Sequence, residues 1–585
     1  MDDRPTDSPA PAPSTTWSFA IVAASALVGL TLLADQAVHL STTYDEVTYL
    51  RVASDWWRTG QQENITRMGT GLTAWKLQLA PTYWALDRLG YASWVDDPIA
   101  HQVELLPIAR MGGSWFWLAS LLMTSYWAYQ LYGPRAMALA AVVFALSPNL
   151  LAHGTLVTME MPLVAGSSAM LLGFWSFLKT GRRRDFWATA AIGGLAFSLK
   201  YTIILIPPIF GLLWVGDLWR NRPDAEAEDR PRRYKSLGRI VLRVGLAMIP
   251  FLAVMALSNL VVTGFATLPL SQKTDNHLVI EGRSPAIKAI AVKILETSWP
   301  SDWVGFANQM KLQKMGGMSY LFGERRTTGW KYYYPVTIAV KVPLAFWLLV
   351  VGRALMRRRP IRGDREWFLP AFVAAFLLIA MLASKRNFGY RYVLPLEVPA
   401  IVWASALATG GRRSWVFLAL GVGGMTAALA SIHPHELSYF NEVAGGPIGG
   451  RKVLADSNLD WGQGAKSLAR LQRHRPEFRD LTVYYFGDAD PALFGVEGKV
   501  YILRAPFPPD DLPEVVSSPT EYLAVSASLQ WGPWGPEGYF RELDGVTPVA
   551  YTDDRTIALY RASDLAEVRK NGMAARPFKT GRGPG

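Results

Sequence analysis

Long runs of apolar residues recur along the first three quarters of the chain. Most runs hold about 17 to 25 mostly uncharged residues, and a helix of that length crosses roughly 30 Å of hydrocarbon. We therefore expect a polytopic α-helical membrane protein with about eleven transmembrane helices, of which the fifth is the shortest. The expected spans are residues 17–40, 113–131, 136–152, 157–179, 186–199, 201–217, 240–264, 332–352, 366–383, 392–410 and 414–432.

The pattern changes after residue 432. Short runs rich in β-branched and aromatic residues alternate with turn residues, which predicts strands at 482–486, 499–503, 521–526 and 556–560 and a helix near 467–472. We expect residues 433–585 to form a C-terminal extracytoplasmic α/β domain, because this part is too polar to span a bilayer and long enough to fold.

Three other stretches complete the expected domains. Residues 1–16 are rich in Pro, Ser, Thr and Asp, which predicts a disordered cytoplasmic N-terminus. Within the transmembrane domain, residues 17–432, two long outer loops at 41–112 and 265–331 are rich in Trp and Tyr. Helical apolar spacing in 75–89 predicts a segment along the membrane interface, with its aromatic rings at headgroup level.

Composition agrees with a membrane protein. Half of the 585 residues are hydrophobic, 23 are Trp, and the mean hydropathy is +0.14, which is too apolar for one ordinary soluble core. The chain has no cysteine, so it has no disulfides and no thiolate metal site. Only Arg4 precedes the first apolar run, among three acids, which favours an uncleaved first span; the alternative is a signal peptide cleaved after Ala34.

The net charge of +12 indicates topology rather than a nucleic-acid partner, because the cations cluster in short connections between apolar runs. Threaded alternately, the eleven spans put these clusters on one side, the cytoplasm, with the N-terminus inside and the tail from His433 outside. The site would then face out of the plasma (inner) membrane. The clusters are Arg182–Arg184, 220–239, 353–365 and Arg412–Arg413.

Asp45 and Glu46 follow the first apolar run at the point where a membrane helix surfaces. Carboxylates at that depth are costly unless something uses them. On a helix, adjacent residues point about 100° apart, so one could act as a base while the other holds a substrate. The alternative is a solvated acidic cap.

His153 and Glu160 are seven residues apart, so they share a face if the helix is continuous, with Pro162 as a local kink. Residues 147–154 contain helix-breaking residues typical of a tight outer turn. The side chains of His153 and Glu160 are therefore candidates for one pocket. Glu160 is the only charge between His153 and Lys179, which makes it the stronger functional candidate. A structural, hydrogen-bonded role is the alternative for His153.

Lys385, Arg386 and Arg391 lie in a short outer loop, against the positive-inside trend. A lipid phosphate at the outer interface would explain them, since Arg offers a planar fork to phosphate oxygens. Pairing with headgroups or loop carboxylates is the alternative. Lys200 and Lys341 are similar candidates, although Lys341 has Glu397 as an alternative partner. Further along, Asp456 and Asp460 either border the cavity or, as we favour, have a structural role.

These motifs resemble the GT-C glycosyltransferases of the protein O-mannosyltransferase-like, phospholipid-carrier-dependent family, in its bacterial branch. The resemblance extends over nearly the whole chain in order. It rests on Tyr44-Asp45-Glu46, Ser147-Pro148-Asn149, 158–162, 320–324, Gly329-Trp330, Tyr333-Tyr334-Pro335, Lys341-Val342-Pro343, 389–395, 435–442 and 456–463.

The resemblance implies a GT-C-like fold and inverting transfer of a sugar from a polyprenyl-phosphate carrier to an acceptor hydroxyl on the outer face. It implies Asp45 as general base and Glu46 as the residue that orients the acceptor or the base. Glu160 is the implied second acid, where the family usually has Asp. By the same resemblance, Lys200, Arg386 and Arg391 hold the carrier phosphate.

We expect as partners the lipid-linked donor, a glycan, lipid or protein acceptor and membrane lipids, but no nucleic acid. No Gly-rich nucleotide loop follows a predicted strand, which fits a lipid-linked donor. A divalent cation between carboxylates and phosphate is open, with no ligands assigned. The competing functions are a transporter or flippase for a lipid-linked glycan precursor, for which we see no inverted repeats, and a membrane scaffold.

Overall fold

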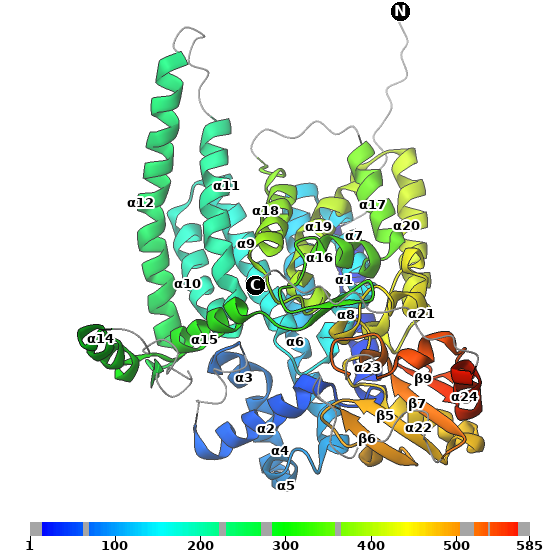
Figure 1. The fold of residues 1–585 in the computed structure, drawn as a ribbon. Coiled ribbons are helices and arrows are strands. Elements are labelled where there is room, and N and C mark those ends of the chain that lie inside the picture. Colours follow the sequence, from blue (N-terminus) through cyan, green and yellow to red (C-terminus); the bar gives the residue numbers. More distant parts are fainter. Residues whose placement is uncertain are drawn as a thin grey trace, which may run out of the picture.

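The computed structural model describes residues 15–61, 69–221, 230–270, 284–356, 364–503, 520–535 and 539–570. Nearly all of the expected disordered segment 1–16 lies outside these ranges. Figure 1 shows the long helices running between two ends of the molecule. The strands β5 to β9 and the helices α2, α4 and α5 gather at one end, and α11, α12, α17 and α20 extend to the other.

Five helices of the described part are long and apolar enough to cross a membrane, and up to seven spans result if each of two bent pairs counts as one. The chain is therefore an integral membrane protein, with a helical fold of five to seven candidate spans. The five are α1 (Thr15–His39), α9 (Glu160–Thr180), α11 (Ile206–Arg220) with the preceding 3-10 helix η2 (Tyr201–Leu205), the 237–262 part of α12 (Arg230–Val262) and α20 (Arg412–Ala430).

The remaining expected spans differ from this set in length or continuity. The bent pairs are α7 (Pro134–Ala145) with α8 (Pro148–Thr155), at 62°, and α16 (Tyr333–Lys341) with α17 (Leu344–Leu355), at 102°. Shorter apolar helices are α18 (Phe368–Ala383) and the segment Leu394–Thr409, which contains α19 (Glu397–Ser405) between short 3-10 turns. The helix α10 (Arg183–Leu199) has 17 residues.

Two expected boundaries are wrong for identifiable reasons. A continuous helix over 332–352 is broken at Val342 and Pro343, because proline lacks an N–H and restricts the residue before it. The second expected span begins too late, since α6 (Gln102–Tyr132) starts eleven residues earlier and includes Pro107 and the buried Arg110.

The described parts of the two segments that were expected as outer loops contain helices and strands. The first holds α2 (Tyr44–Thr59), α3 (Leu72–Gln78), α4 (Ala80–Arg88) and α5 (Ala92–Asp96). The second holds α14 (Pro285–Glu296), α15 (Ser301–Met315) and two antiparallel pairs, β1 (Thr267–Pro269) with β2 (Ser298–Pro300) and β3 (Ser319–Leu321) with β4 (Glu324–Arg326).

The segment 75–89 only partly follows the expected interfacial pattern. It is helical, but Trp75 and Tyr83 are fully buried, and Trp75 makes an edge-to-face contact with Tyr49 of α2 at 5.0 Å between ring centroids. Trp84 is exposed. Trp75 of α3 and Tyr83 of α4 therefore pack against α2, and the Tyr83 hydroxyl donates to the Leu50 carbonyl at 3.3 Å.

The predicted strands and helix of the C-terminal part are confirmed within one or two residues. The four predicted strands and a fifth, β8, which was not predicted, form a five-stranded sheet in the order β6-β5-β7-β9-β8. Strands β6, β5 and β7 are parallel, and β9 is antiparallel to both of its neighbours. The elements are α22 (Ala465–His474), β5 (Leu481–Phe486), β6 (Lys499–Leu503), β7 (Tyr522–Ser526), α23 (Ala527–Gln530), β8 (Ala550–Tyr551), β9 (Ile557–Arg561) and α24 (Ala562–Lys570), preceded by α21 (Gly446–Gly450).

The sheet packs directly against the helix that begins with the acidic pair. Val47 of α2 is completely buried in the same apolar cluster as Leu468 of α22 and Val483 of β5. Backbone bonds reinforce this contact, since the Tyr44 N–H donates to the Trp461 carbonyl at 2.7 Å. The start of α2 is thus held between the transmembrane helices and the sheet.

Candidate active site

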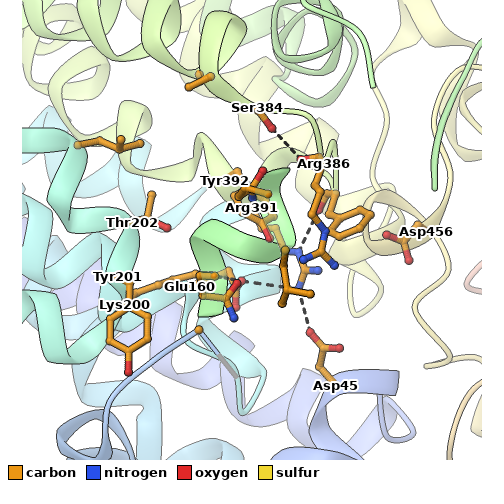
Figure 2. A pocket seen from close by; sticks show the side chains of 18 of the residues that line it. Asp45, Glu160, Lys200, Tyr201, Thr202, Ser384, Arg386, Arg391, Tyr392 and Asp456 are labelled. Carbon is orange, nitrogen blue, oxygen red and sulfur yellow. Dashed lines mark hydrogen bonds and ion pairs between the residues drawn. The ribbon is translucent and has the colours of Figure 1, made fainter. Parts of the chain in front are cut away.

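A cavity of about 540 Å³ opens where α2, α9, α10 and α18 meet the C-terminal part. Its wall combines charged residues from distant segments with an apolar side from η2 and α18. Figure 2 shows Glu160 and Lys200 on one side of Arg391, Asp456 on the other side, and Asp45 below. Residues that line it include Tyr44, Asp45, Tyr49, Glu160, Lys200, Phe376, Ile379, Ala380, Arg386, Arg391, Tyr392, Asp456, Trp461, Phe486 and Trp534.

Asp45 reaches the cavity from the first turn of α2. The helix starts there because Thr43 and Glu46 form a capping box, in which each bonds the other's backbone N–H. Asp45 Oδ2 accepts a hydrogen bond from Arg391 Nη1 at 3.0 Å. Burial raises the pKa of Asp45 above its ordinary value, against the opposing effect of the Arg391 charge.

Glu46 points away from the cavity into a closed ion pair. Its side chain is fully buried, and its two oxygens accept from Arg110 Nη2 at 2.7 Å and Nε at 2.9 Å. They also accept from the backbone N–H groups of Thr43 and Val157, each at 2.9 Å. Burial acts to raise the pKa of Glu46, but Arg110 and these donors lower it overall. With these contacts, Glu46 is in a position to hold α2, not to touch a substrate in the cavity.

Glu160 is the first residue of α9, and Lys200 follows the last residue of α10. Lys200 Nζ donates to Glu160 Oε1 at 2.6 Å, and Arg391 Nη1 lies 3.7 Å from the same oxygen. Glu160 Oε2 is buried and has no hydrogen-bond partner within the described ranges. The continuous helix on which a shared face of His153 and Glu160 depended is not present, because α8 ends at Thr155 and α9 begins after a four-residue break.

Arg391 lies at the centre of the charged wall. It belongs to a short 3-10 turn that follows Gly389, whose φ of 97° favours glycine. A Cβ on Gly389 would also lie 2.6 Å from the Ser457 hydroxyl, so the turn can pack closely against the C-terminal part. The Arg391 guanidinium stacks over the Trp461 ring at 4.3 Å.

Arg386 is the cation of the wall that carries no carboxylate partner among the described side chains. Its Nε is buried without a hydrogen bond there, and its guanidinium lies 4.6 Å from the Phe388 ring centroid. An unsatisfied guanidinium beside two paired cations is a suitable anion-binding group. Lys385, its neighbour, is exposed and does not line the cavity.

His153 and Lys341 are also outside the cavity wall. Both are buried, and Lys341 Nζ donates to the carbonyls of Asn458 at 2.7 Å and Leu437 at 3.0 Å. The alternative pairing of Lys341 with Glu397 is not found. Glu397 instead accepts from Ser147, Tyr390 and Asn149. Lys341 thereby joins the bend between α16 and α17 to the C-terminal part.

Several wall residues were not singled out from the sequence as site candidates. Asp456 lines the cavity, although a structural role was favoured for it, whereas Asp460 is buried and accepts from the Ser528 and Gly462 N–H groups. Phe486 and Trp534 could not be predicted as site residues from their neighbours in the sequence. Phe486 ends a strand and Trp534 lies in a loop, and both reach the cavity only because the sheet packs against α2. Within the described ranges, no group of three or more His, Cys, Asp or Glu is arranged to hold a metal ion.

Three comparisons relate the chain to known proteins. The family model "Dolichyl-phosphate-mannose-protein mannosyltransferase" matches residues 116–223, which cover most of α6 through α11. No curated protein sequence gives a significant match.

Among solved structures, ArnT from Cupriavidus metallidurans bound to undecaprenyl phosphate is similar at 13% identity and a TM-score of 0.45, covering 94% of this chain and 98% of that one. Mycobacterial arabinofuranosyltransferase AftD gives 14% identity, a TM-score of 0.39 and coverage of 94% and 40%. The Archaeoglobus fulgidus oligosaccharyltransferase has 13% identity and a TM-score of 0.40, and the match covers 88% of this chain and 70% of that one. Over residues 116–223, the family match agrees with the resemblance that the motifs indicated.

Proposed function

We propose that the protein is an inverting glycosyltransferase that moves a sugar from a polyprenyl-phosphate carrier to an acceptor hydroxyl. The observation that carries this proposal is the cavity in which Asp45 and Glu160 meet Lys200, Arg386 and Arg391. The description of the matching family, "Dolichyl-phosphate-mannose-protein mannosyltransferase", supports the carrier class.

The cations supply the leaving-group end of the reaction. A phosphate bound by Arg386 and shared with Arg391 and Lys200 would carry away negative charge as the bond from the anomeric carbon to the phosphate oxygen breaks. Phe376, Ile379 and Ala380 of α18 form an apolar wall beside these cations, which suits the polyprenyl chain.

Asp45 supplies the base. As the acceptor oxygen bonds to the anomeric carbon on the face opposite the phosphate, its proton passes to an Asp45 carboxylate oxygen, and the configuration inverts. Glu160, held by Lys200, keeps Arg391 in place by its charge. Of the predicted catalytic residues, Glu46 has a supporting position in this scheme.

We further propose that eleven apolar segments cross the plasma membrane and that the cavity faces outward. The 21-residue α9 starts at Glu160 in the cavity, and α10 returns to Lys200, so the basic turn Arg182–Arg184 lies about 30 Å from the site. Positive charge at that far end favours its cytoplasmic side. Residues 433–585 then form an outer α/β domain above the bilayer, and 41–112 and 265–331 are structured outer segments.

The test compares Asp45→Asn with Asp55→Asn, an exposed position on the same helix. Purified protein is given radiolabelled polyprenyl-phosphate sugars, and transfer and carrier binding are both measured. Loss of the base should slow transfer by about 10² to 10⁴ while carrier binding persists, and Asp55→Asn should match the unmodified chain. Full transfer by Asp45→Asn would remove the base assignment. A transporter or flippase would translocate the carrier without any transfer.

A further inference from the structure

Three aromatic rings from separate parts of the chain form one side of the cavity. Phe486, at the end of β5, lies nearly parallel to Tyr44 at 5.6 Å between centroids and to Trp534 at 6.1 Å. Tyr44 precedes Asp45, so this aromatic wall begins next to the proposed base. All three rings line the cavity.

A carboxylate is fixed to this wall. Asp456 Oδ1 accepts a hydrogen bond from Trp534 Nε1 at 2.9 Å, and the backbone N–H of Asp456 donates to the Ser528 hydroxyl at 3.2 Å. The residue adopts a left-handed φ of 58°, a conformation that costs energy and persists only where surroundings enforce it. Within the described part of the chain, Asp456 makes no ion pair with a cation.

The aromatic wall and the apolar wall suit different parts of a substrate. The side formed by α18 and η2 is largely apolar and fits hydrocarbon, whereas a buried carboxylate would penalise a hydrocarbon tail. Arg391 lies between the two sides, bonded to Asp45 and stacked on Trp461. A molecule whose phosphate is at Arg391 and whose tail follows α18 therefore directs its remaining group towards Asp456.

The chemistry of this wall matches a polyhydroxylated ring. Aromatic faces pack against the C–H face of a sugar, and a carboxylate accepts strong, charge-assisted hydrogen bonds from hydroxyl groups. A site built to bond a hydroxyl discriminates strongly against compounds without one. We propose that Tyr44, Phe486, Trp534 and Asp456 form a saccharide subsite, in which Asp456 binds ring hydroxyls and the rings stack against the sugar.

The orientation of the sugar rests on the proposed function, because the phosphate position comes from it. The bound saccharide is either the sugar of the lipid-linked donor or a saccharide acceptor. Both present the same ring chemistry to the wall. Asp456 acts here as a specificity-determining residue, and Asp45 remains the proposed base.

The experiment uses the full chain in lipid nanodiscs with Asp456→Asn, Trp534→Ala and Trp534→Phe. Asp480→Asn, at an exposed position of the same sheet region, is the matched control. Three probes are measured: undecaprenyl phosphate, undecaprenyl-phosphate mannose, and a panel of methyl glycosides followed by saturation-transfer NMR. Arg386→Ala serves as the phosphate-binding variant.

If the subsite binds the donor sugar, Asp456→Asn and Trp534→Ala should bind the mannosyl carrier about tenfold more weakly than the unmodified chain. This loss corresponds to one hydrogen bond to a charged group. Their affinity for the bare carrier should not change. Trp534→Phe keeps an aromatic ring, so its affinity for the mannosyl carrier should lie between that of the unmodified chain and that of Trp534→Ala. For an acceptor subsite, only the methyl-glycoside signal should disappear. Arg386→Ala should weaken the binding of both carriers and leave the binding of the glycosides unchanged.

Two results would overturn the subsite. One is equal weakening of bare and mannosyl carriers by Asp456→Asn, which would indicate a structural role. The other is wild-type protein that binds no glycoside and gains no affinity from the sugar on the carrier. If the proposed function is wrong, the unmodified protein should bind neither carrier. Binding of the methyl glycosides, and its loss in Asp456→Asn, then tests the subsite independently.

Discussion

Two neighbouring carboxylates, Asp45 and Glu46, enter different environments because one helical step turns the side chain by about 100°. Asp45 faces a cavity and a single guanidinium, whereas Glu46 is enclosed by Arg110 and two backbone donors. The sequence was sufficient to select the pair and to predict that its members differ. It could not tell which one faces the cavity, since that depends on Arg110 and Val157, more than sixty residues away.

The environment of Asp45 gives a pH prediction. Its pKa is raised above 3.8 by burial, and a general base must be ionised to accept a proton. The kcat/KM for transfer should therefore be at its maximum at high pH. It should fall about tenfold per pH unit once the pH drops below this raised pKa. The measurement is kcat/KM against pH, with carrier binding followed in parallel. A profile that stays flat down to the ordinary aspartate range would contradict Asp45 as the base.

At the scale of elements, the Glu46–Arg110 pair joins three segments: the start of α2, the helix α6 and the strand-like turn before α9. Arg110 also donates to the carbonyls of Ala37, Leu40 and Ser41 at the end of α1. A completely buried pair of this kind fixes geometry, and removing one partner leaves an uncompensated charge.

Glu46→Gln should therefore destabilise the protein by about 3 to 5 kcal/mol, and Arg110→Gln by a similar amount. The double variant should cost clearly less than the sum, because the two residues share one interaction. Thermal unfolding in detergent measures all three, with Asp55→Asn as control. A Glu46→Gln protein of unchanged stability that has lost only activity would instead favour the catalytic role implied by the resemblance.

Element types were predictable where periodicity is local. The strands of the C-terminal sheet follow from β-branched and aromatic runs, and α22 from its helical spacing. Hydropathy alone does not locate bends inside apolar stretches, so the break at Pro343 was missed. Of the helices in 41–112 and 265–331, only those in 75–89 were predicted from the sequence.

At the scale of the whole molecule, the proposed orientation can be tested by labelling single cysteines introduced into this cysteine-free chain. Arg183 and Asp480 are both exposed and lie on opposite sides of the expected bilayer; Ser457 is buried and unsuitable. A membrane-impermeant maleimide should label Asp480→Cys, and Asp55→Cys with it, in intact cells. Arg183→Cys should react only after permeabilisation. Labelling of Arg183→Cys and Asp480→Cys from the same side would refute the eleven-span arrangement.

The contact between the sheet and α2 has a consequence for how the enzyme is made. Trp461, Phe486 and Trp534 complete a cavity whose acids and cations are supplied by residues 45 to 391, so a nascent chain still emerging from the insertion machinery has only an open cleft. Under the proposed function, the complete cavity is available to a lipid-linked sugar only after Trp461, Phe486 and Trp534 have packed beside α2. A polypeptide halted after α20 would be inserted yet inert.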